Sequence, residues 1–216
     1  MIDIDLLQKR LRQPLPGWYA QRNMAASQMR SISPIAPPQD AKQSAVLFTL
    51  FEKNSDWFTL LIERTQRNVS DKHSGQISFP GGKRDMADNS LQATAIRETW
   101  EEIGLMISEK EILGALTPLY IPVSNFWVQP FLAHIIIPQT FTIQPTEVVQ
   151  VLEVKLDDLL DSNNLRLKDV QVGSGFQLKN VPHFMVNGVA VWGATAMMIN
   201  ELLTLLKQPV SSDDEL

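Results

Sequence analysis

A short segment of the chain, RETWEEIG at residues 97–104, places one arginine and three glutamates within six positions. On a helix, Glu98 lies beside Glu101 and Glu102, which follow it by three and four residues. Like charges at these spacings cost an isolated helix roughly 0.2–0.5 kcal/mol per pair. A hard divalent cation such as Mg²⁺ binds carboxylate oxygens and would turn this repulsion into attraction. The spacing therefore indicates a candidate metal site, with a solvated acidic helix face as the alternative.

Arg97 lies four residues before Glu101 and could hold that carboxylate while the other two remain available for a metal ion. An ordinary helix salt bridge is the alternative role for this arginine. At about 100° per residue, the helix is expected to pack through one face and to present its glutamates on the other. The two predicted faces are Ile96, Trp100 and Ile103 on the packed side, and Glu98, Glu101 and Glu102 on the exposed side.

Two glycines precede this helix and end the short strand predicted at 76–82. Gly81 and Gly82 permit close backbone approach and unusual dihedral angles. Asn89 is expected to cap a helix over 90–103, and Gly104 supplies the left-handed residue that ends it. A glycine pair alone is usually a turn, but the glycines, the capped helix and the acidic face together favour a functional site.

The composition is that of an ordinary globular protein, with 216 residues of which 44% are hydrophobic and 20% charged. Cysteine is absent, which excludes disulfides, thiolate metal sites and cysteine nucleophiles and is consistent with the reducing cytoplasm. A net charge of −5 gives no indication of nucleic-acid binding, and no apolar run is long enough to predict a membrane span. We expect an N-terminal helix and lead-in at 1–40, one main domain at 41–208 and an acidic tail at 209–216.

Strands and helices alternate irregularly along the predicted domain, with one hairpin and several single helices. This order favours an α/β fold in which helices cover both faces of a mixed β-sheet, as an α/β/α sandwich. The predicted strands lie at 44–51, 56–63, 76–82, 111–122, 126–137, 146–156 and 176–186. Beyond the helix at 90–103, helical segments are predicted around Ile4 to Leu11, at 157–162 and at 193–207.

The glycines and the acidic helix together resemble the Nudix box, whose pattern is G-x5-E-x7-R-E-U-x-E-E-x-G-U, with U a bulky apolar residue. The matching residues are Gly82, Arg97, Glu98, Glu101, Glu102, Gly104 and Leu105. The chain departs from the pattern in having Asp88 in place of the first glutamate and eight residues between Asp88 and Arg97. Thr99 also stands at the first apolar position.

The segments LLIERT and GQISFPGG resemble one branch of that family, the coenzyme A pyrophosphatases. Thr65 replaces the serine of that branch, and Asp71 stands where the branch has arginine. The resemblance implies a metal-dependent hydrolase that cleaves the diphosphate of coenzyme A or its derivatives. The implied products are 4′-phosphopantetheine and adenosine 3′,5′-bisphosphate.

The resemblance also implies roles for individual residues. Mg²⁺ or Mn²⁺ would be bound by Glu98 and Glu102, with Glu101 as a further ligand, while Arg97 orients the carboxylates. The general base would be Glu147, on a loop after the helix, or Glu98 within the box.

The implied substrate is a small nucleotide similar to coenzyme A, bound by a monomer or homodimer. Backbone groups of Gly81 and Gly82 would lie beside its phosphates, and a basic loop would recognise its 3′-phosphate. The residues proposed on or beside this loop are Arg64, Arg67, Lys72 and His73. Phe126 and Trp127 are expected to pack in the sheet, with adenine stacking as the alternative.

Three other functions remain open at this point. An ADP-ribose or dinucleotide pyrophosphatase would use the same acidic box with different loops. A non-catalytic module could bind a nucleotide without cleaving it, although such a module would not need all three glutamates. The third, a purely structural protein, is supported only by the N-terminal amphipathic helix.

Overall fold

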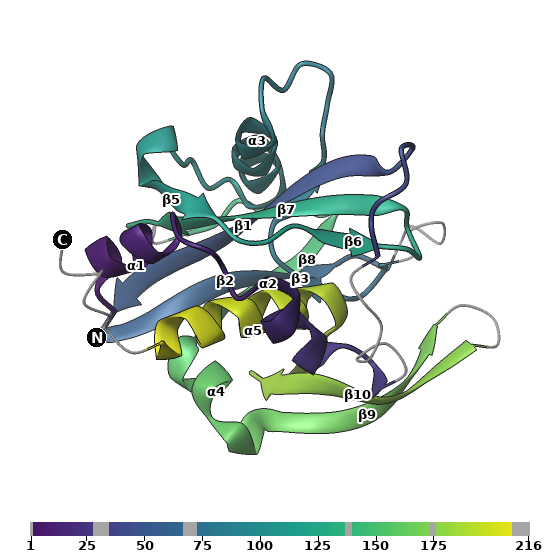
Figure 1. Cartoon of the computed structure of the whole chain (residues 1–216). Helices are drawn as coiled ribbons and strands as arrows, with labels where there is room; N and C mark the ends of the chain where they lie inside the picture. The colour runs from purple at the N-terminus through teal and green to yellow at the C-terminus, as the bar shows by residue number, and fades with distance from the viewer. Residues whose placement is uncertain (1, 28–34, 67–72, 137–139, 173–175, 209–216) are drawn as a thin grey trace.

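The computed structural model describes residues 2–27, 35–66, 73–136, 140–172 and 176–208 (Figure 1). The large sheet has eight strands, with the order β3-β2-β1-β7-β5 along its main path. Its strands are β1 (Lys42–Lys53), β2 (Asp56–Arg64), β3 (Ile77–Ser78), β4 (Gly81–Lys83), β5 (Ile112–Ala115), β6 (Leu119–Ile121), β7 (Phe126–His134) and β8 (Val148–Lys155). β1 runs parallel to β7 and antiparallel to β2 and β4, so the predicted mixed sheet is confirmed.

The hairpin of β1 and β2 forms where the sequence predicts it. Lys53 pairs with Asp56, so Asn54 and Ser55 alone make the turn. Both have positive φ, at 55° and 66°, which matches the twist of the flanking strands.

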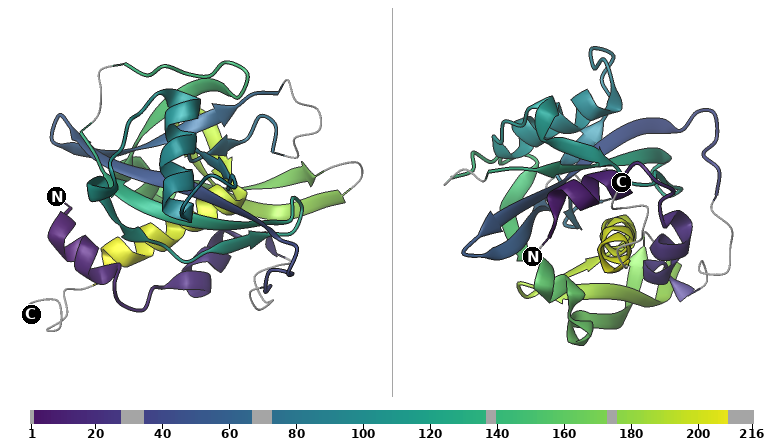
Figure 2. Two further views of the ribbon diagram at one scale, coloured as in Figure 1. Left: turned by 90° about the horizontal axis from the view of Figure 1, so that it is seen from above. Right: turned by 60° about the vertical axis from the view of Figure 1, so that its left-hand side comes forward.

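Helices cover both faces of the large sheet, as predicted (Figure 1). α3 (Leu91–Ile103) packs on one face, and α5 (Gly193–Lys207) lies on the other (Figure 2). Below α5 is a second sheet of three strands, β9 (Leu165–Val172), β10 (Phe176–Val186) and β11 (Val189–Trp192). The remaining helical elements are α1 (Ile4–Arg10), α2 (Gly17–Gln21), η1 (Arg22–Met24), η3 (Glu109–Glu111), α4 (Leu156–Leu160) and η4 (Ser162–Asn164).

β1 separates two hydrophobic cores because its side chains alternate between the faces of the sheet. Phe48 and Leu50 join the core that includes residues of α5, whereas Ala45 and Leu47 join the core beneath α3. A strand buried on both faces carries a nearly continuous apolar run, as β1 does.

The N-terminal segment packs against the last helix. Leu7 of α1 is 2% exposed and belongs to the core that includes α5. Arg10 donates hydrogen bonds to the carbonyl oxygens of Leu205 and Gln208, at 3.1 and 3.0 Å. These contacts satisfy carbonyl groups at the end of α5. The domain boundary at residue 40 stays a prediction, and the tail at 209–216 lies outside the described residues.

None of the helices in the described ranges is long and apolar enough to span a membrane. Two strands of the small sheet, β9 and β11, were missing from the prediction. β9 reads LRLKDVQV, in which charged residues interrupt the apolar ones, as suits its place at the edge of the sheet.

The buried carboxylate of Glu201 joins three elements. It accepts hydrogen bonds from the Gly17 N–H at 3.1 Å, the Gln21 side-chain amide at 2.9 Å and the Thr117 N–H at 3.2 Å. Glu201→Ala should lower the free energy of unfolding by about 3 kcal/mol, because buried donors lose their acceptor. Urea denaturation would measure this change. Glu52→Ala, at an exposed glutamate of β1, should change it by less than about 0.5 kcal/mol; equal losses in both variants would contradict the structural role of Glu201.

Candidate active site

α3 begins and ends close to the predicted positions. Ser90, one residue after the predicted cap Asn89, accepts a hydrogen bond from the Ala93 N–H at 3.0 Å. Gly104 has φ 71°, as the predicted left-handed end requires. A side chain at Gly104 would also press against Thr142, so the position needs glycine for space as well as for its backbone angle.

The predicted faces of α3 are partly wrong. Trp100 is 55% exposed, whereas Glu102 is only 1% exposed. The buried face instead includes Thr99 and Ile103 together with Glu102. This difference from the prediction has a physical reason. The Gly81 N–H on the sheet donates to Glu102, so the carboxylate can be buried without losing a hydrogen bond.

Arg97 holds three carboxylates through its guanidinium group. Its Nε and Nη2 donate to the two oxygens of Asp88, both at 2.8 Å. Its Nη1 donates to Glu98 at 2.9 Å and to Glu101 at 2.8 Å, and Nη2 also donates to the Lys83 carbonyl at 3.2 Å. A guanidinium has five N–H groups in a fixed plane, and five contacts are made here. The predicted pairing with Glu101 is therefore one part of a larger network.

Asp88 fixes the position of Arg97 in this network. It is 8% exposed and also accepts hydrogen bonds from the Asp85 N–H and the Thr94 hydroxyl, both at 2.9 Å. The hydrogen-bonded guanidinium of Arg97 holds the pKa of Asp88 well below its usual range, although burial opposes this shift. Asp88 was not among the predicted site residues; its place in the box pattern was the available signal.

The two glycines let the sheet and the helix approach closely. The carboxylate of Glu98 lies against Gly82, where a side chain would collide with it. Gly81 lies equally close to the backbone of Ala45 and Val46, and its N–H donates to Glu102 at 2.8 Å. Both glycines thus position the glutamates, and their place beside the phosphates of a substrate stays a prediction.

Burial changes the protonation of two glutamates. Desolvation raises the pKa of Glu102 to about 8, against the opposing effects of the Gly81 N–H and the Arg64 guanidinium. The negative charges of Glu98 and Glu147 add to this increase. Burial also raises the pKa of Glu98, although Arg97 opposes the change. The site therefore concentrates carboxyl groups in a partly buried place that disfavours their ionised forms.

Glu147 reaches this place through the segment that precedes β8. The Thr142 and Gln144 N–H groups donate to the carbonyl oxygens of Ile103 and Glu102, at 3.0 and 2.9 Å. These bonds satisfy carbonyl groups at the end of α3 and fix the segment there. The Glu147 carbonyl then accepts the Thr65 N–H at 2.8 Å, while its side chain stays exposed.

The structure thus groups the predicted residues differently from the prediction. Glu98, Glu102 and Glu147 influence one another electrostatically, whereas Glu101 is nearly half exposed and turned toward Arg97. Arg64, predicted to bind a phosphate, places its Nη1 3.5 Å from a Glu102 oxygen. His73 Nδ1 lies 3.2 Å from the side-chain oxygen of Gln76. The predicted residues Arg67 and Lys72 lie outside the described residues, as does Asp71.

A hard divalent cation fits this group of side chains. The available ligands are carboxylate oxygens, and their mutual repulsion is what a cation would remove. As the side chains stand, no three His, Cys, Asp or Glu residues of the described ranges are arranged to hold a metal ion. The fit therefore concerns Glu98 and Glu102, and the three-glutamate set stays a prediction.

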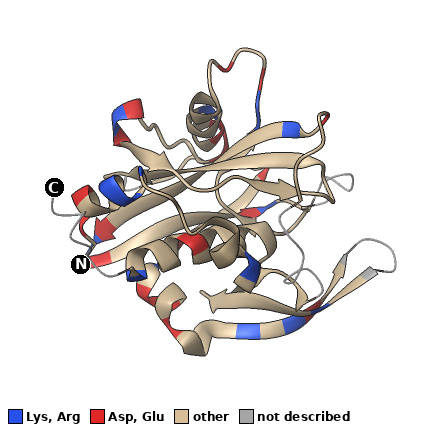
Figure 3. Ribbon diagram, viewed as in Figure 1, with Lys and Arg blue, Asp and Glu red and all other residues tan. Residues whose placement is uncertain are grey.

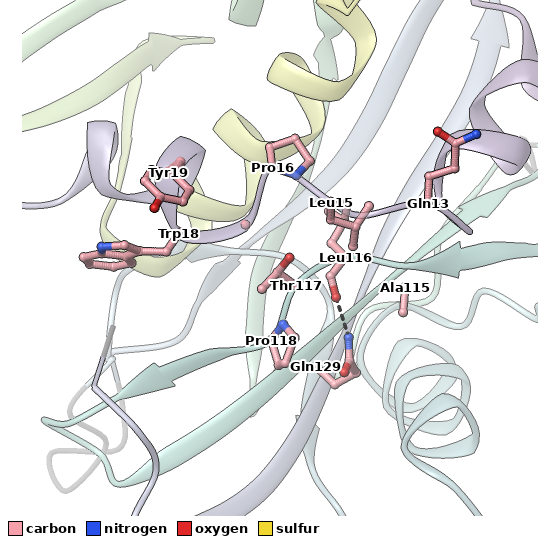
Figure 4. Close-up of a pocket in the computed structure, with 11 residues that line it drawn as sticks. Gln13, Leu15, Pro16, Trp18, Tyr19, Ala115, Leu116, Thr117, Pro118 and Gln129 are labelled. Carbon is pink, nitrogen blue, oxygen red and sulfur yellow. Dashed lines mark hydrogen bonds between the residues drawn. The ribbon is translucent and has the colours of Figure 1, made fainter. Parts of the chain in front are cut away.

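Two open pockets accompany the fold, and they differ in chemistry. The larger, of about 580 Å³, lies between the N-terminal segment and the link from β5 to β6 (Figure 4). It has no charged side chain in its lining, so it offers nothing to neutralise a phosphate. The smaller, of about 370 Å³, is lined by Gln43, Lys83, Arg84, Asp85 and Met86, directly after the two glycines. Figure 3 shows charged residues of both signs on α3 and on the loop before it.

The raised pKa of Glu102 predicts a pH-dependent stability in metal-free protein. Between about pH 4.5 and 8 the folded state keeps a proton that the unfolded state has lost. The free energy of unfolding should therefore fall with rising pH across this window, by roughly 1 kcal/mol per pH unit. Glu102→Gln, which cannot titrate, should lose most of this slope in denaturation experiments with a chelator. Parallel pH profiles for the two proteins would refute the buried-carboxylate assignment.

Comparison with known proteins agrees with this geometry. The model of the NUDIX domain family matches residues 41–171. The human protein named mitochondrial coenzyme A diphosphatase NUDT8 is 36% identical over 149 residues, which are 68% of this chain and 62% of the human protein. The protein of Pectobacterium atrosepticum named uncharacterized Nudix hydrolase NudL is 32% identical over 168 residues, which are 78% of this chain and 84% of that protein.

Among solved structures, a MutT/nudix family protein from Enterococcus faecalis has a TM-score of 0.48 and 15% identity, over 87% of this chain and 70% of that chain. This likeness is too distant to carry a conclusion. The named relatives confirm the resemblance to the coenzyme A pyrophosphatase branch. The family model matches more than half of the length of this chain, so the chain belongs to the Nudix family.

Proposed function

We propose that the protein hydrolyses the diphosphate bond of coenzyme A, or of a coenzyme A derivative, in a reaction that depends on a divalent cation. The observation that carries this proposal is the position of Glu98 and Glu102 beside the two glycines, with Glu147 near enough for its charge to raise the pKa of both. The name of the human relative, a coenzyme A diphosphatase, supports the choice of substrate. Water attacks one phosphorus and the P–O–P bond breaks, releasing 4′-phosphopantetheine and adenosine 3′,5′-bisphosphate.

Glu98 and Glu102 would hold the cation, with Glu101 as a further contact. When bound, Mg²⁺ or Mn²⁺ would neutralise charge on the phosphate oxygens and polarise the attacking water. Arg97 fixes the direction of the Glu98 carboxylate through its 2.9 Å hydrogen bond, so the carboxylate does not have to be ordered during the reaction.

The general base has two candidates. Glu147 is exposed and forms no ion pair with another described residue, and its backbone is fixed between α3 and β2, so it can accept a proton from water at the site. Glu98 is the alternative, but its carboxylate is already bound by Arg97. Geometry therefore favours Glu147.

Several finer predictions remain part of this proposal. Arg64 and His73 lie at the ends of the basic segment before the glycines, where they were expected to bind the 3′-phosphate. The cytoplasmic location and the monomeric or homodimeric state also stay predictions. ADP-ribose hydrolysis and nucleotide sensing without cleavage are the competing functions.

Turnover of coenzyme A, ADP-ribose and NADH should be compared with Mg²⁺ and with Mn²⁺, with identification of the products. We expect coenzyme A to be the best substrate. Glu102→Gln should reduce kcat by about 10³-fold or more with folding preserved, because a charged ligand of the cation is lost. Glu52→Gln, an exposed change far from the glycines, should retain wild-type rates.

Each alternative has its own outcome in this comparison. Cleavage of ADP-ribose without cleavage of coenzyme A would favour the first competing function. Binding without turnover of any substrate would favour a sensor. Wild-type activity in Glu102→Gln would disprove the metal site.

Glu147→Gln should lower kcat by about 10²-fold, the usual contribution of a general base, and should remove the acidic limb of the pH–rate profile. Its melting temperature should stay close to that of the wild type, because the side chain is exposed. Should kcat and the pH profile both remain unchanged, Glu98 becomes the candidate base.

A further inference from the structure

Four side chains form a row across the large sheet beside the candidate active site. Tyr120 of β6 pairs with Trp127 of β7, and Trp127 pairs with Gln43 of β1. Arg84, just after β4, donates its N–H to the Gln43 carbonyl and its Nη1 to the Gln43 side chain, both at 2.9 Å. Paired residues on neighbouring strands point to the same face, so these four side chains form one row, the cross-sheet row.

The cross-sheet row lies on the same face as the acidic side chains. Gln43 is two residues before Ala45, which packs in the core beneath α3. Arg84 is two residues after Gly82, against which Glu98 lies. Side chains two residues apart share a face, so the row runs beside Glu98 at a distance of about 7 Å along the strands.

The cross-sheet row is also accessible. Gln43 and Arg84 are exposed, and Trp127 and Tyr120 are half-buried. The 370 Å³ pocket opens at the Gln43 and Arg84 end of the row. A molecule held at the carboxylates could therefore extend along this face without displacing α3.

The positive charge of Arg84 is not balanced by an ion pair within the described ranges. Arg84 donates to neutral acceptors, the Gln43 side chain and the Asp88 carbonyl. Neither Arg84 nor the neighbouring Lys83 forms an ion pair with any described residue. A phosphate group is a ligand that suits a guanidinium that has no ion pair within the described residues.

We propose that the cross-sheet row binds the adenosine 3′,5′-bisphosphate half of the substrate. The adenine base stacks on Trp127, and the phosphate remote from the scissile bond binds Arg84. The spacing of about 7 Å between Gly82 and Arg84 suits two phosphates separated by one ribose. This inference rests on the proposed function, because it assigns part of that substrate.

The assignment differs from the one expected from the basic segment at 64–73. Arg64 lies opposite the buried carboxylate of Glu102, so at least part of its charge is used within the protein. His73 Nδ1 is engaged with Gln76. Arg84 instead lines the 370 Å³ pocket and donates only to neutral acceptors.

Calorimetric titration without metal tests the inference independently of catalysis. The ligands are adenosine 3′,5′-bisphosphate and adenosine 5′-monophosphate, which differ by the remote phosphate. Wild type should bind the bisphosphate at least tenfold more tightly. Arg84→Ala should reduce this preference to about twofold, and Arg84→Lys should keep most of it. Arg12→Ala, at an exposed arginine after α1, is the matched control and should keep the full preference.

The base site is tested with the same two ligands. Trp127→Ala should weaken both ligands by tenfold or more while the preference between them remains, and Trp127→Phe should restore binding. Trp100→Ala removes an exposed tryptophan of α3 and should leave both affinities unchanged. Melting temperatures confirm that each variant is folded.

Full preference for the bisphosphate in folded Arg84→Ala would overturn the phosphate site. If folded Trp127→Ala bound both ligands as tightly as Trp127→Phe and the wild type, the base site would be overturned. Failure of wild type to bind the bisphosphate would overturn both. The expected binding pattern in a protein that does not cleave coenzyme A would sustain this inference and refute the proposed function. Coenzyme A cleavage without the expected binding pattern would sustain the proposed function and refute this inference.

Discussion

The repulsion between carboxylates is the constraint around which this end of the molecule is built. Glu98, Glu102 and Glu147 bring negative charge together where burial already disfavours it. Arg97 opposes this repulsion through its hydrogen bond to Glu98, and the two oxygens of Asp88 accept two further N–H groups of Arg97 and fix its position. Asp88 stays ionised because it is paired, so one buried ion pair stabilises an arrangement that the glutamates alone would not keep.

Backbone geometry determines which carboxylates can approach one another. Gly82 gives Glu98 a flat surface without a side chain, and Gly81 gives Glu102 an N–H donor that permits its burial. At the other end, the last carbonyls of α3 accept N–H groups from Thr142 and Gln144. The end of α3 is therefore capped by the segment that leads to Glu147, and the same hydrogen bonds hold this segment where the charge of Glu147 acts on Glu98 and Glu102.

Local patterns predicted most of the fold because each element carries its own physical signal. The two-residue turn at Asn54 and Ser55 and the glycine end of α3 follow from backbone preferences that do not depend on distant residues. β9 lacks such a signal, because its charged residues match an edge strand and a loop equally well. The packing of α1 through Leu7 depends on α5, about 190 residues later, and no local pattern contains that contact.

The candidate site shows where residue-type reasoning ends. Angular counting treated Glu102 as exposed because glutamates usually are, and it treated Trp100 as buried for the opposite reason. Glu102 is buried because a backbone N–H on the sheet satisfies its carboxylate, whereas Trp100 lies on the exposed side of the helix. Likewise, the cationic character of Arg64 was visible in the sequence, but the carboxylate it faces was not. The residue types show which charges must be balanced, whereas only the fold determines which groups balance them.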